Sequence, residues 1–469
     1  MQTKKKQETQ QDWKLDIGLD SKFAGNGKSW FPFFMGIIPL VGACTTLAVC
    51  TPSHLRIVVF RSVFFSAGGY IVTRCMLPGI SVKIPASRRG CDLLKRPPRE
   101  PIQANDKIIP ESMGIVSGVV FVLVLVLTQA TTTIKRYDLR LEYAAAMLCI
   151  TFAVLLGFVD DFLDLEWKYK YALPPLMSMP LVAAYDGGTR IIPPRFCRVL
   201  LIENKDLEFN KLSKFGFFLH KFILKPLFHG AVDLSSGSLD LGLAYKIYMI
   251  ALGVFCTNAI NILAGVNGLE AGQVYVIACA IITMSAIELN RAAQWDIDYN
   301  VSGATKNHLF AVTLMLPFAT TTLALLKDNW FPAKIFVGDT FTNYAGMSLA
   351  VVAILAHFPI MLMLLMLPQL VNFFLSIPQL FGLWPCPRHR LPSYDPQTGL
   401  LHASRLNDRN SSFVQTKLAH RLNLTLINFF LLVFGPMTEP ALATSLLLFQ
   451  LICCLIGLTL RFFLTGYIY

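Results

Sequence analysis

Acidic residues gather at the end of one long apolar run. Asp160 and Asp161 are adjacent there, and Lys170 follows nine residues after Asp161. Neighbouring carboxylates repel each other and are costly at the edge of an apolar environment, so this pair favours a role in binding metal or phosphate or in proton transfer. Asp161 and Lys170 would lie on opposite faces of a continuous helix, so they can meet only if the chain turns between them. Glu166 and Lys168 are more simply interpreted as interfacial charges that reach toward water.

Amide side chains form a second candidate group. Asn258 and Asn261 are three positions apart, which places them on one face of a helix. Amide oxygens are suitable hard ligands for Mg²⁺ and add no charge. Asn267 precedes Gly268, and this pair is also a turn signal, so Asn267 could act in binding or only in a turn.

A single carboxylate, Asp339, follows Gly338 at the start of another apolar run. One interpretation is that Asp339 is simply the N-cap of the helix that begins there. The other is that a carboxylate at a helix N-terminus, beside a glycine turn, holds Mg²⁺ against a diphosphate.

Two arginines flank a histidine in a fourth group, formed by Arg388, His389 and Arg390 after a proline-rich turn. Guanidinium groups offer fork-shaped donors, so this group would make a rigid cationic clamp for phosphates. A basic patch for lipid headgroups is the alternative, although a histidine is unusual in such a patch.

Together the four groups supply acids, amides, a lysine and arginines. This combination suits Mg²⁺-assisted transfer of a phosphoryl group between a soluble and a lipid-borne phosphate, in which catalysis is chiefly positioning and charge stabilisation. The sequence contains no Walker P-loop, dinucleotide-binding fingerprint or His-Glu-x-x-His motif.

Composition indicates which elements must hold these groups. Of the 469 residues 54% are hydrophobic and only 15% are charged, with a mean hydropathy of +0.54. A soluble protein of this size could not hide so much apolar surface in one core. Apolar runs of about 20 residues, the length of a membrane-spanning helix, recur near 32–50, 56–78, 113–131, 142–159, 170–185, 244–262, 270–289, 308–326, 340–357, 358–380 and 437–463. We therefore predict an all-α integral membrane protein, a polytopic bundle of about ten to eleven transmembrane helices.

The first run could be a signal sequence or a retained membrane anchor. About 30 mostly polar residues precede it, and no small-x-small cleavage site follows it, so a retained anchor is the better interpretation. Residues 1–55 are thus expected to be an N-terminal extension with an extra anchor.

The basic segment 83–107 is expected to lie in the cytosol, because short loops rich in Lys and Arg stay on that side. Alternation then places 160–170, 263–269, 327–339 and 381–423 on the same side, which implies one shared site on a cytosolic face. Segment 186–243 is also basic, yet alternation makes it lumenal; long loops follow the charge rule poorly, so we keep the alternation. The net charge of +12 is attributed to loops that face anionic lipid headgroups and not to nucleic acid.

Five stretches resemble, in order and spacing, the polyprenyl-phosphate N-acetylhexosamine-1-phosphate transferases, and among them the branch that uses dolichyl phosphate. They are 157–161, 258–273, 337–340, 372–379 and 385–390. The resemblance covers 56–469 and implies one membrane domain, with a lumenal loop at 186–243 that carries an insertion near 199–232 and a cytosolic substrate-binding loop at 381–423. It implies transfer of N-acetylglucosamine-1-phosphate from UDP-N-acetylglucosamine to dolichyl phosphate, the first step of lipid-linked oligosaccharide synthesis for protein N-glycosylation.

The resemblance also implies roles for individual residues. Mg²⁺ on the nucleotide-sugar diphosphate would be held by Asn261 and Asp339. Lys170 would neutralise phosphate, and Asp160 with Asp161 would orient or deprotonate the incoming lipid phosphate. The remaining expected substrate-binding residues are Arg388, His389 and Arg390 around the diphosphate and the N-acetyl sugar, with Trp167 nearby, and Asn267, Phe336, Glu111, Asp92 and Leu93 around uridine. Asn258 is also expected to bind substrate.

The same resemblance implies a location in the endoplasmic reticulum membrane, contact with membrane lipid, a homodimer, and sensitivity to nucleoside antibiotics such as tunicamycin. The chain departs from the family at Leu94, where Asn is usual, and at Cys91, where Gln is common; both departures lie beside the residues expected around uridine.

Two alternatives remain. A related transferase could use another sugar nucleotide or another lipid. A membrane transporter would be expected to carry charged residues near the middle of its spans, whereas runs such as 113–131 and 340–357 carry none.

Overall fold

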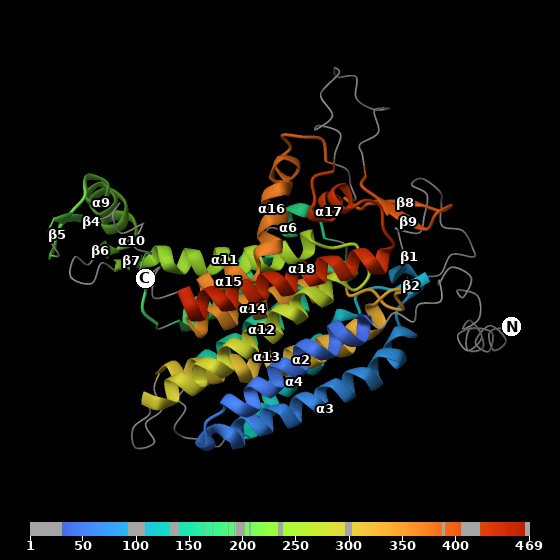
Figure 1. Cartoon of the computed structure of the whole chain (residues 1–469), viewed down its shortest axis with the longest axis horizontal. Helices are drawn as coiled ribbons and strands as arrows, with labels where there is room; N and C mark the ends of the chain where they lie inside the picture. Colours follow the sequence, from blue (N-terminus) through green and yellow to red (C-terminus); the bar gives the residue numbers. More distant parts are fainter. Residues whose placement is uncertain are drawn as a thin grey trace.

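The computed structural model describes residues 31–91, 108–131, 140–163, 165–170, 172–185, 187–191, 193, 202–205, 208–232, 238–295, 303–386, 390–404 and 423–464. Within these ranges long helices lie side by side in a bundle, and the labelled strands are short and lie at its two ends (Figure 1). The predicted all-α class is confirmed.

The long apolar runs of the sequence form the helices of the bundle. These are α2 (Phe31–Cys50), α3 (Arg56–Ser81), α4 (Gly114–Thr131), α5 (Arg140–Leu163), α7 (Leu173–Ala184), α11 (Leu243–Ile262), α12 (Leu269–Ala292), α13 (Gly303–Asn329), α14 (Gly338–Leu355), α15 (Pro359–Leu365), α16 (Leu367–Leu380) and α18 (Glu439–Thr459). Shorter helices in the connections are α6 (Trp167–Lys170), α9 (Lys214–Phe218), α10 (Lys225–Phe228) and α17 (Leu426–Phe434), with π-helical turns at Leu219–Leu224 and Leu460–Leu464 and 3₁₀ turns at Ser53–Leu55, Ala86–Arg88 and Ala293–Trp295.

Short antiparallel strands fasten the connecting loops. At one end of the bundle β1 (Arg89–Cys91) pairs with β2 (Ile108–Pro110), and β8 (Ser393–Asp395) pairs with β9 (Leu400–His402). At the other end β4 (Ile202–Lys205) pairs with β5 (Glu208–Leu212), and β7 (Leu239–Asp240) lies between β3 (Arg190–Ile191) and β6 (Ala231–Val232). The described parts of the basic connection 186–243 therefore lie at the opposite end from β1 and β2, as alternation of the spans requires (Figure 1).

Fewer helices than predicted meet the requirements for a span by length and composition alone. Among the described residues seven do so, in the helices α3, α4, α5, α11, α12, α13 and α18, and the bent pair α15–α16 would make an eighth. The expected spans near 32–50 and 170–185 are present as shorter apolar helices at Gly36–Cys50 and Leu173–Ala184. Helix α14 is less apolar because its first turns carry Asp339, Thr340 and Asn343.

Helix α14 lies in the centre of the bundle, where it packs on α4, α5, α11, α12 and α13. Small residues allow the close approach: a Cβ at Gly157 of α5 would lie 2.8 Å from Thr340 Cα, and one at Gly346 would lie 2.5 Å from the backbone of Thr257 in α11. Such crossings at glycine are typical of membrane helices. This packing holds the start of α14, and with it Asp339, against the ends of α5 and α11.

The chain bends by 75° between α15 and α16. Three buried glutamines from different helices meet at this bend. Gln369 Nε2 donates at 2.7 Å to Gln273 Oε1 of α12 and at 2.7 Å to Gln450 Oε1 of α18, while Gln450 Nε2 donates at 2.7 Å to the carbonyl of Leu365. The carbonyl of Leu365, where the helix breaks, thereby has a hydrogen-bond partner, which a backbone polar group in an apolar surrounding requires.

Beyond the bend, the buried face of α16 fastens the following segments. Asn372 Oδ1 accepts a hydrogen bond from Leu426 N–H at 2.8 Å, and Gln379 Oε1 accepts one from Leu424 N–H at 2.9 Å. The Gln379 amide also donates to the Pro385 carbonyl at 3.1 Å. Helix α16 thereby sets where the predicted substrate-binding loop begins and ends.

Candidate active site

The end of α5 and the start of α14 form the centre of the site. Asp161 accepts hydrogen bonds from Asp339 N–H at 2.7 Å, Thr340 N–H at 2.9 Å and the Thr340 hydroxyl at 2.6 Å. Backbone donors in the first turn of a helix have no partner in that helix. Gly338 has a φ of +74°, and a Cβ at this position would collide with Asp161. Asp161 therefore caps α14 from another helix, and Asp339, the second residue of α14, is not an N-cap.

Lys170 joins the other two carboxylates. Helix α5 ends at Leu163, and Lys170 belongs to the separate helix α6, so the chain turns as the spacing required. Its Nζ lies 2.9 Å from Asp160 Oδ1 and 3.6 Å from Asp339 Oδ2. The Asp160 side chain is 5% exposed and that of Asp339 is 31% exposed. Asp339 is thus the carboxylate that a soluble ligand can reach most easily.

Asn261 completes the cluster from the end of α11. Its Nδ2 donates to Asp339 Oδ1 at 2.9 Å. The Asn258 amide donates instead to the Val254 carbonyl of its own helix at 2.8 Å, although both asparagines are exposed. The predicted pair on one helix face thus contributes one member, Asn261, to the hydrogen bonds of the cluster.

The donor set suits one particular kind of metal site. The described residues contain no group of three or more His, Cys, Asp and Glu side chains able to hold a metal ion. Asp339 and Asn261 together offer a carboxylate and an amide oxygen, if the amide turns by half a rotation. Mg²⁺ commonly takes one or two protein oxygens and completes its shell with phosphate and water. The residues present therefore fit Mg²⁺ bound together with a diphosphate.

The loop after α11 is held by two further carboxylates. Glu270 Oε1 accepts a hydrogen bond from Gly265 N–H at 2.8 Å, and Glu439 Oε1 accepts one from Asn267 N–H at 2.8 Å. Leu391 lies against Gly265, so the loop beyond α16 returns to the end of α11. Asn267 is 6% exposed, and its position in this turn is fixed through its backbone.

Two of the residues expected around uridine, Phe336 and Glu111, lie together. Phe336 N–H donates to the Pro110 carbonyl at 2.9 Å, and Met113 N–H donates to the Phe336 carbonyl at 3.0 Å, so Glu111 stands beside Phe336. Partial loss of solvation raises the pKa of the Glu111 carboxyl group, the Arg88 cation lowers it, and the charge of Asp339 raises it. The electrostatic interaction with Asp339 therefore links Glu111 to the acidic cluster.

Arg390 is the described member of the predicted cationic clamp. Its Nη1 is buried and has no hydrogen-bond partner among the described residues. Burial lowers the pKa of the Arg390 guanidinium from its ordinary value, but arginine remains charged at neutral pH. An unpaired guanidinium donor is suited to an incoming anion.

For several expected site residues the structure describes no side chain. Asp92, Leu93, Arg388 and His389 lie outside the described residues. Trp167 begins α6, but its side chain is not among those described.

Some contributors were missed in the sequence. Thr340 binds Asp161, and Glu270 and Glu439 hold the loop after α11. Glu270 and Glu439 are carboxylates at the ends of apolar runs, the same signal that singled out Asp160 and Asp161. Thr340 gave no such signal, because a threonine at the start of a helix is common.

Comparison with known proteins gives a consistent result. The profile of the family described as "Glycosyl transferase family 4" matches residues 143–357. The chain is 38% identical over 444 residues to the UDP-N-acetylglucosamine–dolichyl-phosphate N-acetylglucosaminephosphotransferase of Dictyostelium discoideum, covering 92% of this chain and 97% of that protein. It is 33% identical to the Saccharomyces cerevisiae protein of the same name, over 83% of this chain and 88% of the relative. A more distant similarity, 25% identity over 236 residues, links it to the phospho-N-acetylmuramoyl-pentapeptide-transferase of Aquifex aeolicus, of which it covers 56%.

Proposed function

The chain belongs to the family of UDP-N-acetylglucosamine–dolichyl-phosphate N-acetylglucosaminephosphotransferases, and on this premise we propose that it catalyses their reaction. It transfers N-acetylglucosamine-1-phosphate from UDP-N-acetylglucosamine to dolichyl phosphate and yields N-acetylglucosaminyl-diphosphodolichol and UMP. This product starts the lipid-linked oligosaccharide used in protein N-glycosylation.

The reaction exchanges one phosphorus–oxygen bond for another. An oxygen of dolichyl phosphate attacks the phosphorus that bears the sugar, and the bond from that phosphorus to the oxygen of UMP breaks. Both substrates carry negative phosphates, so the enzyme must bring like charges together and stabilise the charge that develops on UMP. The observation that carries the proposal is the cluster of Asp160, Lys170, Asp339 and Asn261 at one end of the bundle.

Each member of the cluster has a proposed task. Lys170 neutralises phosphate charge, and its cation favours the ionised form of the neighbouring Asp160. Asp160 orients the lipid phosphate, whereas Asp161 acts as a positioning residue, because its oxygens are engaged by α14. Arg390 contacts the diphosphate through its unpaired Nη1.

Mg²⁺ is the proposed cofactor, held by Asp339 and Asn261. When bound it would neutralise the diphosphate and polarise its oxygens. Chelation with EDTA should remove product formation, and added Mg²⁺ should restore it. Full activity in the presence of the chelator would contradict this assignment.

The proposed location is the endoplasmic reticulum membrane, with the active site toward the cytosol. The basic segment 83–107 supports this orientation through the positive-inside rule, because its described part, 83–91, ends with β1 at the active-site end. A homodimer embedded in membrane lipid is also part of the proposal.

The direct test is a membrane preparation that contains the protein, labelled UDP-N-acetylglucosamine and dolichyl phosphate. A lipid-soluble product that requires Mg²⁺ and is blocked by tunicamycin is expected. Its absence, with the protein correctly inserted, would overturn the proposal. Competition with other sugar nucleotides and other polyprenyl phosphates would identify a related transferase, and solute flux without turnover in proteoliposomes would point to a transporter.

A further inference from the structure

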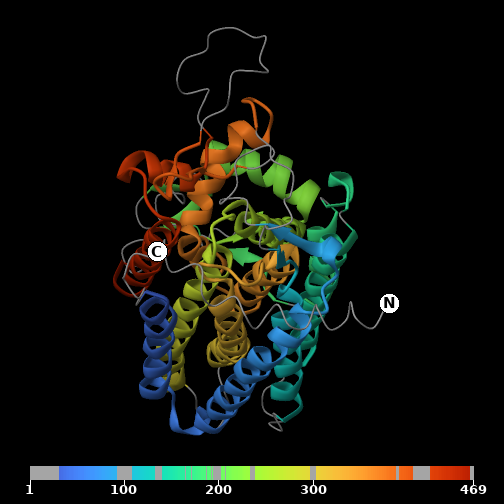
Figure 2. The same ribbon diagram turned by 90° about the vertical axis from the view of Figure 1, so that its right-hand side faces the viewer.

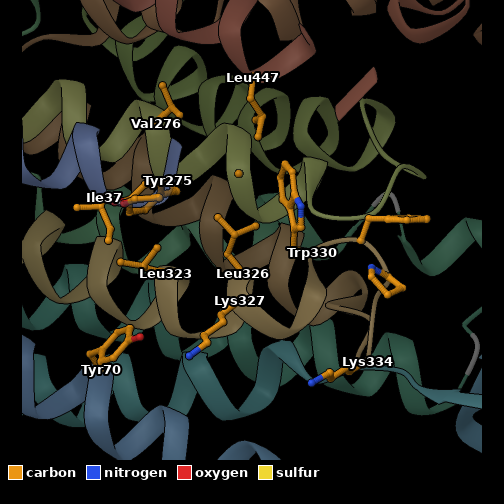
Figure 3. Close-up of a pocket in the computed structure, with 14 residues that line it drawn as sticks. Ile37, Tyr70, Tyr275, Val276, Leu323, Leu326, Lys327, Trp330, Lys334 and Leu447 are labelled. Carbon is orange, nitrogen blue, oxygen red and sulfur yellow. Dashed lines mark hydrogen bonds between the residues drawn. The ribbon is translucent and has the colours of Figure 1, made fainter. Parts of the chain in front are cut away.

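A cavity of about 500 Å³ lies away from the acidic cluster. Figure 3 shows it between α2, α3, α12 and α13, with α18 above. Its walls are mostly apolar, and they include Ile37, Tyr275, Val276, Leu323 and Leu447. None of its lining residues belongs to the cluster around Asp339.

Two lysines line the cavity where α13 ends. Lys327 is in the last turn of α13 and Lys334 is in the segment that follows it. Figure 3 shows both side chains on the side of the cavity toward α3. Both are exposed, and neither forms an ion pair with a carboxylate in the described part of the chain. The nearby Asp328 carboxylate is already paired with Arg74 at 2.5 Å.

The lysines stand at the level expected for phospholipid headgroups. Helix α13 spans Gly303–Asn329, so its last turn and the segment after it reach the membrane surface at the active-site end. Trp330, which also lines the cavity, is of the type that gathers at this interface. Apolar walls below a pair of cations match an amphiphile with a hydrocarbon chain and an anionic head.

We propose that this cavity binds one anionic glycerophospholipid from the leaflet at the active-site end. An acyl chain lies between α2, α12 and α13, and the lipid phosphate contacts Lys327 and Lys334. The site is distinct from that of the acceptor lipid, whose phosphate must reach Lys170 and Asp160 on other helices.

The lipid would stabilise two adjoining parts of the fold. Helix α2 is fastened to α12 by a hydrogen bond from the Tyr275 hydroxyl to the Gly36 carbonyl, and both residues line the cavity. The segment that carries Lys334 is closed by hydrogen bonds from Lys334 N–H to the Asp328 carbonyl at 2.8 Å and from the Asn329 amide to the Ile335 carbonyl at 3.0 Å. Filling the cavity therefore stabilises α2 and the segment that leads into α14.

The test uses the purified full chain in detergent, with phosphatidylserine and phosphatidylcholine as probes. Native mass spectrometry should detect one retained phosphatidylserine, and its addition should raise the Tm by about 4 °C relative to phosphatidylcholine. The double substitution Lys327→Ala and Lys334→Ala should weaken retention at least fivefold. Lys306→Ala, at the opposite end of α13, is the matched control and should retain the lipid like the unchanged protein.

A second pair of variants tests the apolar part. Ile37→Trp should fill the cavity and displace the lipid, whereas Val41→Trp, one turn further along α2 and outside the lining, should not. Equal retention of the two lipids would overturn the proposal. Retention unchanged by both the lysine double substitution and Ile37→Trp would also overturn it. Displacement of phosphatidylserine by an equimolar amount of dolichyl phosphate would also overturn it and assign the cavity to the acceptor. Because these readouts measure binding and not transfer, they are independent of the proposed reaction.

Discussion

Asp339 is the most exposed carboxylate of the cluster that Lys170 and Asn261 contact. Asp339→Asn keeps the shape of the side chain but removes its charge, so we expect product formation to fall by about 100-fold or more while the protein still folds. The measurement is kcat with both substrates saturating, beside thermal unfolding of the same sample. Asp328→Asn, which removes the partner of Arg74, is the control and should leave kcat nearly unchanged. Retention of a tenth or more of the activity by Asp339→Asn would remove Asp339 from the centre of the mechanism.

The adjacent aspartates should behave differently. Asp161 accepts three hydrogen bonds from α14, whereas Asp160 pairs with Lys170. We therefore expect Asp161→Asn to lower the free energy of unfolding by about 1–3 kcal/mol, the cost of losing a helix cap. Asp160→Asn should act mainly on kcat and should lower the free energy of unfolding less than Asp161→Asn does.

A double-mutant cycle checks the capping role of Asp161. Thr340→Val removes the hydroxyl that donates to Asp161, so its effect on unfolding should be smaller in the Asp161→Asn background than alone. Strictly additive effects would mean that the two side chains do not act together.

At the scale of elements, the bend between α15 and α16 depends on the three glutamines. Gln369→Leu would leave the oxygens of Gln273 and Gln450 without this donor, so we expect a loss of about 1–3 kcal/mol of stability. Thermal unfolding in detergent measures it. Ser445→Ala on α18 is the control, because this exposed hydroxyl donates only within its own helix, at 2.9 Å. The interpretation fails if both variants unfold at the same temperature.

Helices were easier to predict than the contacts between them. A run of about 20 apolar residues is a local signal, and all the expected runs coincide with helices. Helix α14 is the instructive case: its polar first turns reduce its apolar character because they build the site. The π-helical turn at Leu219–Leu224 and the strand pairs at both ends have no comparable local signal, since they lie in connections.

The site shows the same division. The meeting of Asp160, Lys170, Asn261 and Asp339 was predictable, because charged and amide side chains at span ends that share one membrane face are brought together by alternation. The use of Asp161 as a cap was not, because it depends on a partner 178 residues away in the chain. Sequence spacing identifies which groups gather, and the packing of α14 on α5 decides which of them remain available to substrate.

At the scale of the whole molecule, the chemistry is confined to one end of the bundle, and a labelling experiment can test which compartment that end faces. The Cys386 thiol is exposed in the loop after α16, whereas Lys225 lies in α10, at the opposite end of the bundle from β1, β2, β8 and β9 (Figure 1); the end with these strands faces the viewer in Figure 2. In sealed microsomes with the cytosolic side outward, a membrane-impermeant maleimide should label Cys386 without detergent. A thiol introduced by Lys225→Cys should react only after detergent is added. Cys91→Ser and Cys197→Ser provide the background, and Cys75 within α3 should stay unlabelled, because the impermeant reagent does not enter hydrocarbon. Labelling of Cys386 only after permeabilisation would place the active site in the lumen, where UDP-N-acetylglucosamine would first have to be imported.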